Sequence, residues 1–192
     1  IPKFINEVEQ KLVLSESAFG SFGIDLMASD IPAAREAYRR EMNAVIDTFF
    51  RRAADVLRVD EALLRYRDAD ERPDVASQLT FSEPAIVTEF SSVRDEHKIH
   101  YDYSFDHVTG PHQQSRFATM MIILLREESG EIHFPRSGEF GLQVAPEPGS
   151  AILFYSQLPD GNFDDYSVSS VKLEKGGELI VFNLFLWDYP RY

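Results

Sequence analysis

The residues best suited to chemistry are a histidine and an aspartate two positions apart, in the stretch Lys98-Ile99-His100-Tyr101-Asp102-Tyr103. Side chains alternate between the two faces of a β-strand, so His100 and Asp102 would point to the same side. Two histidines and one carboxylate on one face of a metal ion hold Fe(II) and leave its other positions for O₂ and a cosubstrate. The spacing alone leaves two interpretations open: a metal site with His100 and Asp102 as two of its ligands, or an ordinary pair on the protein surface.

The third ligand of such a site is not evident from the histidines of the chain. His107 and His112 lie in a segment that could fold over the mouth of the site, so either could substitute. His97 has the opposite strand parity to His100 and should point away. For His133, a packed or solvent-facing strand position is the simpler interpretation. The last 59 residues contain no histidine.

Two helices and a series of short strands are expected to position the pair. Apolar residues at three- and four-residue spacing predict an amphipathic helix over residues 30–58, with Asp30 as N-cap, followed by a helical piece from Asp60 to Arg67. The apolar period then changes to two, which is typical of a sandwich or barrel. The expected strands are Ala85 to Phe90, Ile99 to Tyr103, Phe117 to Leu125, Ile132 to Phe134, Leu142 to Ala145, Ala151 to Tyr155, Tyr166 to Leu173 and Leu179 to Leu186.

Composition excludes several function classes. With 192 residues and 44% hydrophobic content, the chain suits one domain, in which residues 1–75 would form a helical support and residues 76–192 the β core. A net charge of -13 argues against binding to nucleic acids or anionic membranes. The absence of cysteine excludes disulfides and thiolate ligands, and indicates a cytoplasmic location. No apolar run approaches the roughly 18 residues of a membrane helix.

Several segments around this pair occur in an order that resembles the catalytic domain of the prolyl 4-hydroxylase-like branch of the Fe(II)/2-oxoglutarate dioxygenases. The family pattern runs His-x-Asp, Arg-x-x-Thr before an apolar strand, Gly-Glu-Thr-x-Phe-Pro, Pro-x-x-Gly-x-Ala-x-x-Phe and a distal Ser-x-His. The resemblance covers roughly Ala85 to Trp187. After His100 and Asp102, it rests on Arg116-Phe117-Ala118-Thr119, Gly130-Glu131-Ile132-His133-Phe134-Pro135 and Pro146-Glu147-Pro148-Gly149-Ser150-Ala151-Ile152-Leu153-Phe154.

This resemblance implies a mainly β fold with flanking helices: a double-stranded β-helix, or cupin-like jelly-roll, with the N-terminal helix packed on one outer face. It also implies an oxidoreductase in which His100 and Asp102 bind Fe(II), 2-oxoglutarate is decarboxylated, and a small molecule or a peptidyl side chain is hydroxylated or otherwise oxidised. Arg116 and Thr119 match positions that open a core strand, where packing and hydrogen bonding are the simpler roles. Arg116 is a weak candidate for cofactor binding.

Two family positions carry other residues in this chain. Ser169 stands where the distal histidine is expected, with Val168 and Ser170 as one-residue alternatives. Leu179 stands where a lysine or arginine would pair with the distal carboxylate of 2-oxoglutarate. The two losses agree, because a protein that no longer presents 2-oxoglutarate to iron needs no cationic clamp.

These departures leave alternatives open. The chain could be a degenerate or repurposed member that does not use 2-oxoglutarate, serving as a binding module or as an enzyme of rearrangement or elimination. An engineered substitution or missing residues near Ser169 would have the same effect on the motif. Other replacements are a cation from Arg116 or Arg126, or a ligand from the acidic run Asp160, Asp164 and Asp165. A Ser169-His100-Asp102 triad lacks the sequence of a nucleophile elbow around any serine.

Overall fold

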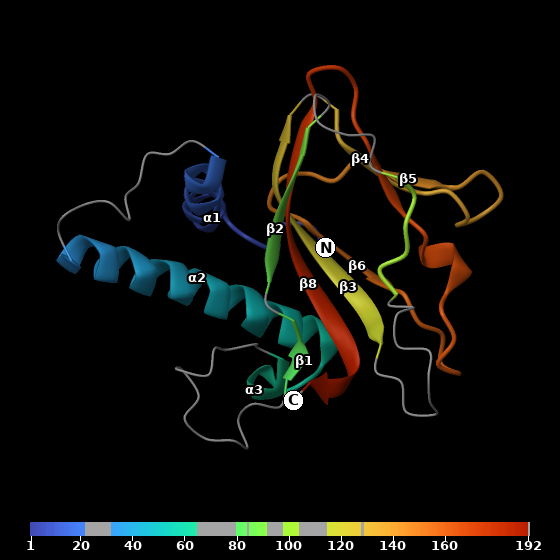
Figure 1. Cartoon of the computed structure of the whole chain (residues 1–192), viewed down its shortest axis with the longest axis horizontal. Helices are drawn as coiled ribbons and strands as arrows, with labels where there is room; N and C mark the ends of the chain where they lie inside the picture. Colours follow the sequence, from blue (N-terminus) through green and yellow to red (C-terminus); the bar gives the residue numbers. More distant parts are fainter. Residues whose placement is uncertain are drawn as a thin grey trace.

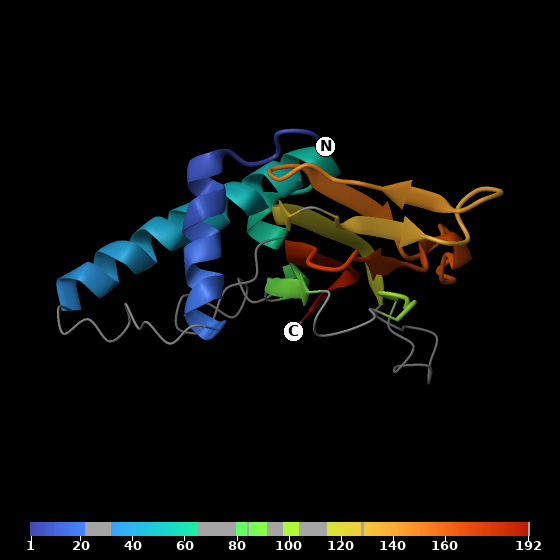
Figure 2. The same cartoon turned by 90° about the horizontal axis from the view of Figure 1, so that it is seen from above.

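The computed structural model describes residues 1–21, 32–64, 80–83, 85–91, 98–103, 115–127 and 129–191. Within these ranges, two facing antiparallel sheets have helices gathered on one side, as Figures 1 and 2 show. None of the described helices is long and apolar enough to cross a membrane. The elements are α1 (Glu7–Ser21), α2 (Pro32–Leu57), α3 (Glu61–Leu64), β1 (Thr80–Ser82), β2 (Ile86–Ser91), β3 (Arg116–Glu127), β4 (Glu131–Phe134), β5 (Leu142–Val144), β6 (Ala151–Tyr155), a 3₁₀ turn (Asp165–Ser167), β7 (Ser170–Lys172) and β8 (Glu178–Arg191).

The larger sheet is built around the two longest strands. Its order is β1-β8-β3-β6, and β2 also pairs with β8. The smaller sheet has the order β5-β4-β7, and all the strand pairs are antiparallel. In Figure 1, β4 and β5 lie on the side of the larger sheet away from the helices. Two sheets arranged in this way enclose an interior into which one face of each strand points.

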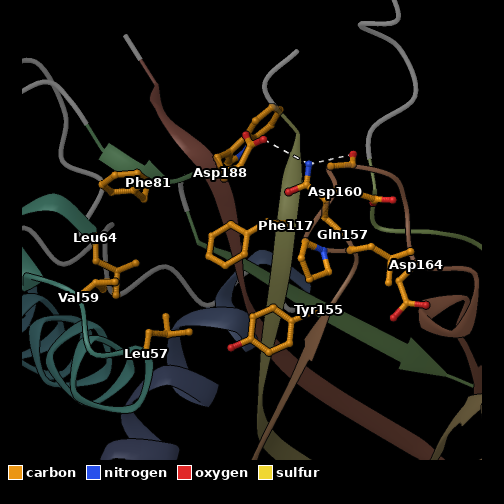
Figure 3. Close-up of a pocket in the computed structure, with 14 residues that line it drawn as sticks. Leu57, Val59, Leu64, Phe81, Phe117, Tyr155, Gln157, Asp160, Asp164 and Asp188 are labelled. Carbon is orange, nitrogen blue, oxygen red and sulfur yellow. Dashed lines mark hydrogen bonds between the residues drawn. The ribbon is translucent and has the colours of Figure 1, made fainter. Parts of the chain in front are cut away.

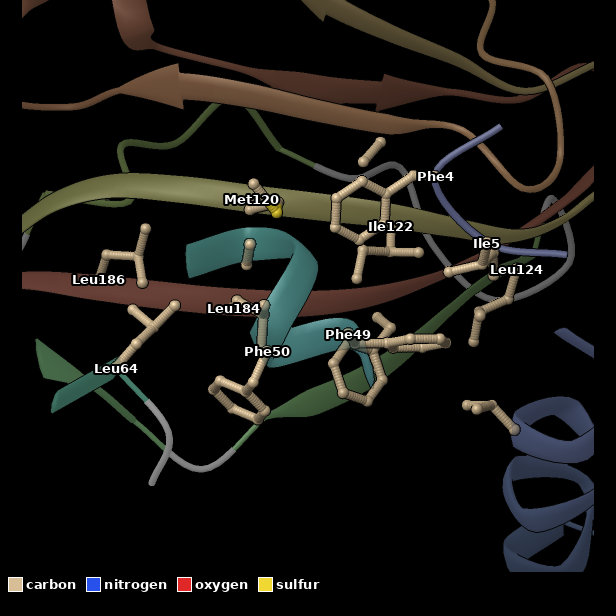
Figure 4. Packing of buried hydrophobic residues seen from close by; sticks show 14 of the residues in the cluster. Phe4, Ile5, Phe49, Phe50, Leu64, Met120, Ile122, Leu124, Leu184 and Leu186 are labelled. Atoms are coloured by element: carbon tan, nitrogen blue, oxygen red, sulfur yellow. The ribbon is translucent and has the colours of Figure 1, made fainter. Parts of the chain in front are cut away.

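The two longest strands are buried on both faces, which explains their continuous apolar sequence. On β3, Met120, Ile122 and Leu124 pack toward the helices, whereas Met121 and Ile123 point between the two sheets. Strand β8 alternates in the same way. Figure 4 shows Phe49 and Phe50 of α2 packed against the helix-facing side of both strands. The ring of Phe49 meets Phe182 edge-on with centroids 5.2 Å apart.

The helices predicted from the sequence are confirmed in part. The predicted helix at residues 30–58 is confirmed over Pro32–Leu57, while Asp30 lies outside the described residues. The second predicted helix is shorter than expected, at Glu61–Leu64, and the predicted boundary near residue 75 also falls outside the described part. Helix α1 was not predicted, although its first turn carries a recognisable capping box.

The capping box of α1 is formed by Asn6 and Glu9. The Asn6 side chain accepts from the backbone of Val8 and Glu9, at 2.9 Å each, and the Glu9 carboxylate accepts from the Asn6 backbone at 2.8 Å. Glu9 also pairs with Arg52 of α2 at 2.7 Å. Partial burial by itself would raise the pKa of Glu9, but the bonds from Arg52 and Asn6 outweigh it and lower that pKa. The two helices are therefore joined by an ion pair.

Two predicted strands were wrong in extent. Ile99 to Tyr103 forms no strand, because only His100 makes a bridge, with Ser169. The expected strand from Tyr166 to Leu173 begins instead as the 3₁₀ turn. Asp164 caps this turn, accepting from the Tyr166 backbone at 2.9 Å, and such local bonds compete with pairing in a sheet. Strand β1 was not predicted.

Three glutamates lie together where β2, β3 and β8 run side by side. Glu127 lies opposite Glu178 in the β3–β8 register, and Glu89 is on β2, two residues from the partner of Glu178. Partial burial, followed by the charges of Glu89 and Glu127, raises the pKa of Glu178. The folded protein therefore binds this proton more tightly than the unfolded chain does.

Glu178→Gln is expected to stabilise the protein at neutral pH by roughly 0.5 kcal/mol, because like charges on facing strands repel. The pKa of Glu178 is higher in the folded protein than in the unfolded chain. Its contribution to the free energy of unfolding is therefore fully present below the unfolded pKa and is lost as pH rises through the folded pKa. The gain should thus vanish at about pH 4, near the ordinary glutamate pKa. Urea unfolding at both pH values measures it, with exposed Glu139→Gln as the control. A gain that is equal at both pH values would contradict the explanation.

Candidate functional site

His100 and Asp102 converge as the sequence predicted. His100 Nε2 lies 3.5 Å from Asp102 Oδ1. His100 Nδ1 lies 3.0 Å from the Lys98 carbonyl oxygen, to which it donates. In a neutral imidazole, this bond leaves the lone pair on Nε2, the atom that faces Asp102. The hydrogen bond to Asp102 raises the pKa of His100, with partial burial acting in the opposite direction.

Asp102 is held from the inside of the barrel by a threonine. Its carboxylate is buried, and its Oδ2 accepts from the Thr119 hydroxyl at 2.9 Å. Thr119 is fully buried on β3. Its bond leaves Oδ1 directed at His100. The sequence suggested a hydrogen-bonding role for Thr119 at a strand end. It did not suggest Asp102 as the partner, because the two residues lie in different segments of the chain.

Ser169 is the direct backbone neighbour of His100. The His100 N–H donates to the Ser169 carbonyl at 3.0 Å, and the Ser169 N–H donates to the His100 carbonyl at 2.9 Å. Residues that exchange both bonds in an antiparallel pair carry their side chains on the same face. The register therefore places Ser169, which is buried, on the His100 side. Val168 and Ser170 have the opposite parity.

The position expected to carry a cation is apolar and closed. Leu179 is completely buried in the cluster between the two sheets, alongside residues such as Phe90, Ile132 and Val181. A leucine side chain can form neither a hydrogen bond nor an ion pair with a carboxylate, and burying an unpaired charge costs free energy. The side chains that surround Leu179 between the two sheets are apolar.

The two arginines considered as replacements have partners within the chain. Arg116 binds Glu83 through two bonds, Nε to Oε1 at 2.6 Å and Nη2 to Oε2 at 2.9 Å. Its guanidinium carbon also lies 3.9 Å from the ring centroid of Phe185. Arg126 donates from Nε to the Gly130 carbonyl at 2.8 Å. Arg116, the first residue of β3, thus forms an ion pair with Glu83.

The other candidate ligands do not join the pair in the part of the chain that the structure describes. His97, His107 and His112 lie outside it, and His133 is half-buried on β4 opposite Gln143 and Ser170. Among the described residues, no group of three histidines or carboxylates could hold a metal ion. The acidic run has local partners: Asp160 binds Asn162, Asp164 caps the 3₁₀ turn, and Asp165 pairs with Arg136.

A concave surface lies apart from this pair. It is a groove of about 930 Å³ between the α2–α3 corner and residues 157–164, and its walls are mainly apolar. Figure 3 shows Leu57, Val59 and Leu64 on one side, with Asp160 and Asp164 on the other. Its charged lining residues are all aspartates. Neither His100 nor Asp102 lines this groove.

Sequence comparisons relate part of the chain to plant enzymes. It is 35% identical over 86 residues to probable prolyl 4-hydroxylase 3, 31% over 93 residues to probable prolyl 4-hydroxylase 10, and 34% over 83 residues to prolyl 4-hydroxylase 1, all of Arabidopsis thaliana. The matches cover 36%, 40% and 38% of this chain and 30%, 32% and 29% of the relatives. The chain thus spans about a third of the length of these relatives. No protein-family model matches the chain.

Structural comparison covers almost the whole chain. The viral collagen prolyl hydroxylase of Paramecium Bursaria Chlorella virus-1, in a truncated form, superposes with a TM-score of 0.63 and 21% identity, over 97% of this chain and 87% of that one. The same enzyme in complex with 2-oxoglutarate gives a TM-score of 0.63 at 19% identity, over 97% and 93%. The predicted double-stranded β-helix is confirmed, as is the resemblance to the prolyl 4-hydroxylase-like branch.

Proposed function

We propose that the protein is a non-haem iron oxidoreductase on a prolyl hydroxylase-like scaffold, with His100 and Asp102 as its protein ligands to the metal. The observation that carries this proposal is the 3.5 Å separation of His100 Nε2 and Asp102 Oδ1, each oriented by a further contact. An imidazole nitrogen and a carboxylate oxygen suit Fe(II). When bound, Fe(II) would supply the activation of O₂.

The residues around the pair support this assignment by fixing both donors. The Lys98 carbonyl holds the imidazole through Nδ1, and Thr119 holds the carboxylate through Oδ2. Partners of this kind orient metal ligands and typically contribute 10- to 100-fold, roughly, to metal affinity. Ser169 brings only a neutral hydroxyl to the third position. We therefore expect weaker metal binding than three protein ligands would give.

2-Oxoglutarate does not fit the residues present, so it forms no part of this proposal. The buried Leu179 stands in the place of a cation, and Arg116 is engaged by Glu83. The viral neighbour forms a complex with 2-oxoglutarate. Reduction of O₂ takes four electrons, and hydroxylation of a side chain supplies two of them. For this chain we expect the other two to come from a reducing cosubstrate other than 2-oxoglutarate, or from further oxidation of the substrate itself.

A polypeptide side chain is the substrate that we propose over a small molecule. The groove of about 930 Å³ is open and mainly apolar, which suits an extended segment. Gly161 lines the groove, and its carbonyl accepts from the hydroxyl of Tyr103, the residue after Asp102, at 3.3 Å. A chain bound in the groove would therefore lie on the loop that also borders the metal-binding segment. The aspartates at its rim favour a segment that carries lysine or arginine.

The second candidate is a binding module or a non-oxidative enzyme on the same scaffold. Ser169 and Leu179 favour it, because both are buried where the family carries a ligand and a cation. The two candidates differ in a measurable way. An oxidoreductase consumes O₂ in the presence of its substrate, whereas a binding module holds the same polypeptide without consuming O₂.

His100→Ala is expected to weaken Mn(II) binding by at least about tenfold, because it removes one of two protein ligands. Mn(II) stands in for Fe(II), and its paramagnetic resonance signal reports the free ion directly. His133→Ala is the matched control, since it removes a half-buried histidine from β4 outside the pair. Equal Mn(II) affinity in wild type and His100→Ala would remove the metal site from consideration.

A further inference from the structure

The segment that carries both candidate ligands is not part of a strand. Among the described residues, its one β-bridge joins His100 to Ser169, and Tyr101 to Tyr103 belong to no strand. Side-chain contacts help to hold the relative position of His100 and Asp102. Thr119 supplies one such contact from the inside, through Asp102.

The outer contact is made by Tyr101, the residue between the two ligands. Its hydroxyl donates to Asp165 Oδ1 and accepts from Arg136 Nη1, the latter at 2.7 Å. Arg136 Nη1 also binds Asp165 Oδ1, so the three groups close a ring. The hydrogen bond to Asp165 raises the pKa of Tyr101 and lowers that of Asp165, as expected when a phenol donates to a carboxylate.

We infer that Tyr101, Arg136 and Asp165 form an outer clamp that positions the metal-binding segment. The clamp joins three parts of the chain that are far apart in sequence: the ligand segment, the turn after β4 and the 3₁₀ turn. The 3₁₀ turn leads directly to Ser169, the backbone partner of His100. The clamp thereby sets how the His100–Asp102 pair faces the third coordination position. This inference rests on the proposed metal site.

Aromatic contacts reinforce the clamp on the same outer side. The ring of Tyr101 meets Phe163 edge-on with centroids 5.4 Å apart, and the ring of Tyr103 lies 6.1 Å from Phe163. The contacts of Tyr101 with Phe163 and Asp165 are distinct from those of Asp102 with Thr119. The ligand segment is thus held from both faces, and Tyr101 is a positioning residue rather than a ligand.

Tyr101→Phe tests the clamp because it removes only the hydroxyl. Loss of these bonds should speed amide hydrogen exchange at His100 and Ser169 by roughly three- to tenfold, in protein without metal. Mn(II) affinity should fall by roughly two- to fivefold, because the bonds of the clamp are exposed to solvent, while the melting temperature stays close to that of wild type. Asp165→Asn, a second variant that keeps the size of the side chain but removes its charge, should act in the same direction.

Tyr166→Phe is the matched control, because it removes an exposed hydroxyl from the residue next to Asp165, outside the clamp. It should match wild type in both measurements. Wild-type exchange and wild-type Mn(II) affinity in Tyr101→Phe would overturn the clamp, while the His100→Ala result still supports the metal site. If His100→Ala retains Mn(II), the proposed function fails, and the exchange rates still decide whether the clamp holds the segment.

Discussion

Ser169→His is expected to tighten Mn(II) binding by about 100-fold, because it adds a third protein ligand to the pair. Ser169 and His100 exchange both backbone hydrogen bonds, so a histidine at residue 169 would carry its imidazole on the same face as His100. The site would then have two histidines and one carboxylate, the set that holds Fe(II). Groups that only hydrogen-bond to a metal ligand already change metal affinity by roughly 10- to 100-fold, so a direct ligand should have an effect at least as large.

Ser170→His provides the control for this gain. It places an imidazole at the next residue, the first of β7, on the opposite face. Both positions are buried, so the unfolding of each variant without metal should be measured to separate packing strain from metal binding. Folded Ser169→His protein that binds Mn(II) no better than wild type would contradict the assignment of residue 169 to the third position.

Glu83→Ala is expected to destabilise the protein by about 3 kcal/mol, the largest loss predicted for a residue outside the metal site. Glu83 is buried and accepts two bonds from Arg116 as well as one from the Trp187 indole at 2.7 Å. Removing one partner of a buried ion pair leaves the other charge uncompensated, which costs roughly 3–5 kcal/mol. The partial exposure of Arg116 places the expected value at the lower end.

A double-mutant cycle separates the pair from its surroundings. Arg116→Met combined with Glu83→Ala should be less destabilised than the sum of the two single variants, because neither charge is then left alone. Urea unfolding of the four proteins gives the coupling free energy, with Glu139→Ala as a control at an exposed glutamate. Strict additivity would mean that Arg116 and Glu83 do not stabilise each other.

The elements that the sequence predicted best are those whose patterns are local. Continuous apolar runs mark the strands that are buried on both faces, and the His-x-Asp spacing correctly predicted that His100 and Asp102 lie on one side. Helix α1 was within reach of the same reasoning, because Asn6 and Glu9 have the spacing of a capping box. It was missed because its apolar residues follow the helical period more weakly than those of α2 do.

The contacts that hold the site could not be predicted, because they join residues far apart in the sequence. Thr119 reaches Asp102 across 17 positions, Tyr101 reaches Asp165 across 64, and Arg116 reaches Glu83 across 33. Each depends on strand register and loop path, which no local pattern records. The strand predicted around His100 was wrong for a related reason. The alternation of residue types suggested a paired strand, but only His100 pairs, with Ser169.

We propose that this barrel binds a metal ion through His100 and Asp102 but does not hold 2-oxoglutarate in the manner of the family it resembles. Calorimetric titration of 2-oxoglutarate into Mn(II)-loaded protein without O₂ tests it most directly. A missing charge-assisted bond weakens binding by roughly 1.5–3 kcal/mol, or about ten- to a hundredfold. With Leu179 buried in an apolar cluster, we predict no saturable heat at micromolar 2-oxoglutarate. Micromolar binding would contradict the claim and favour an ordinary dioxygenase.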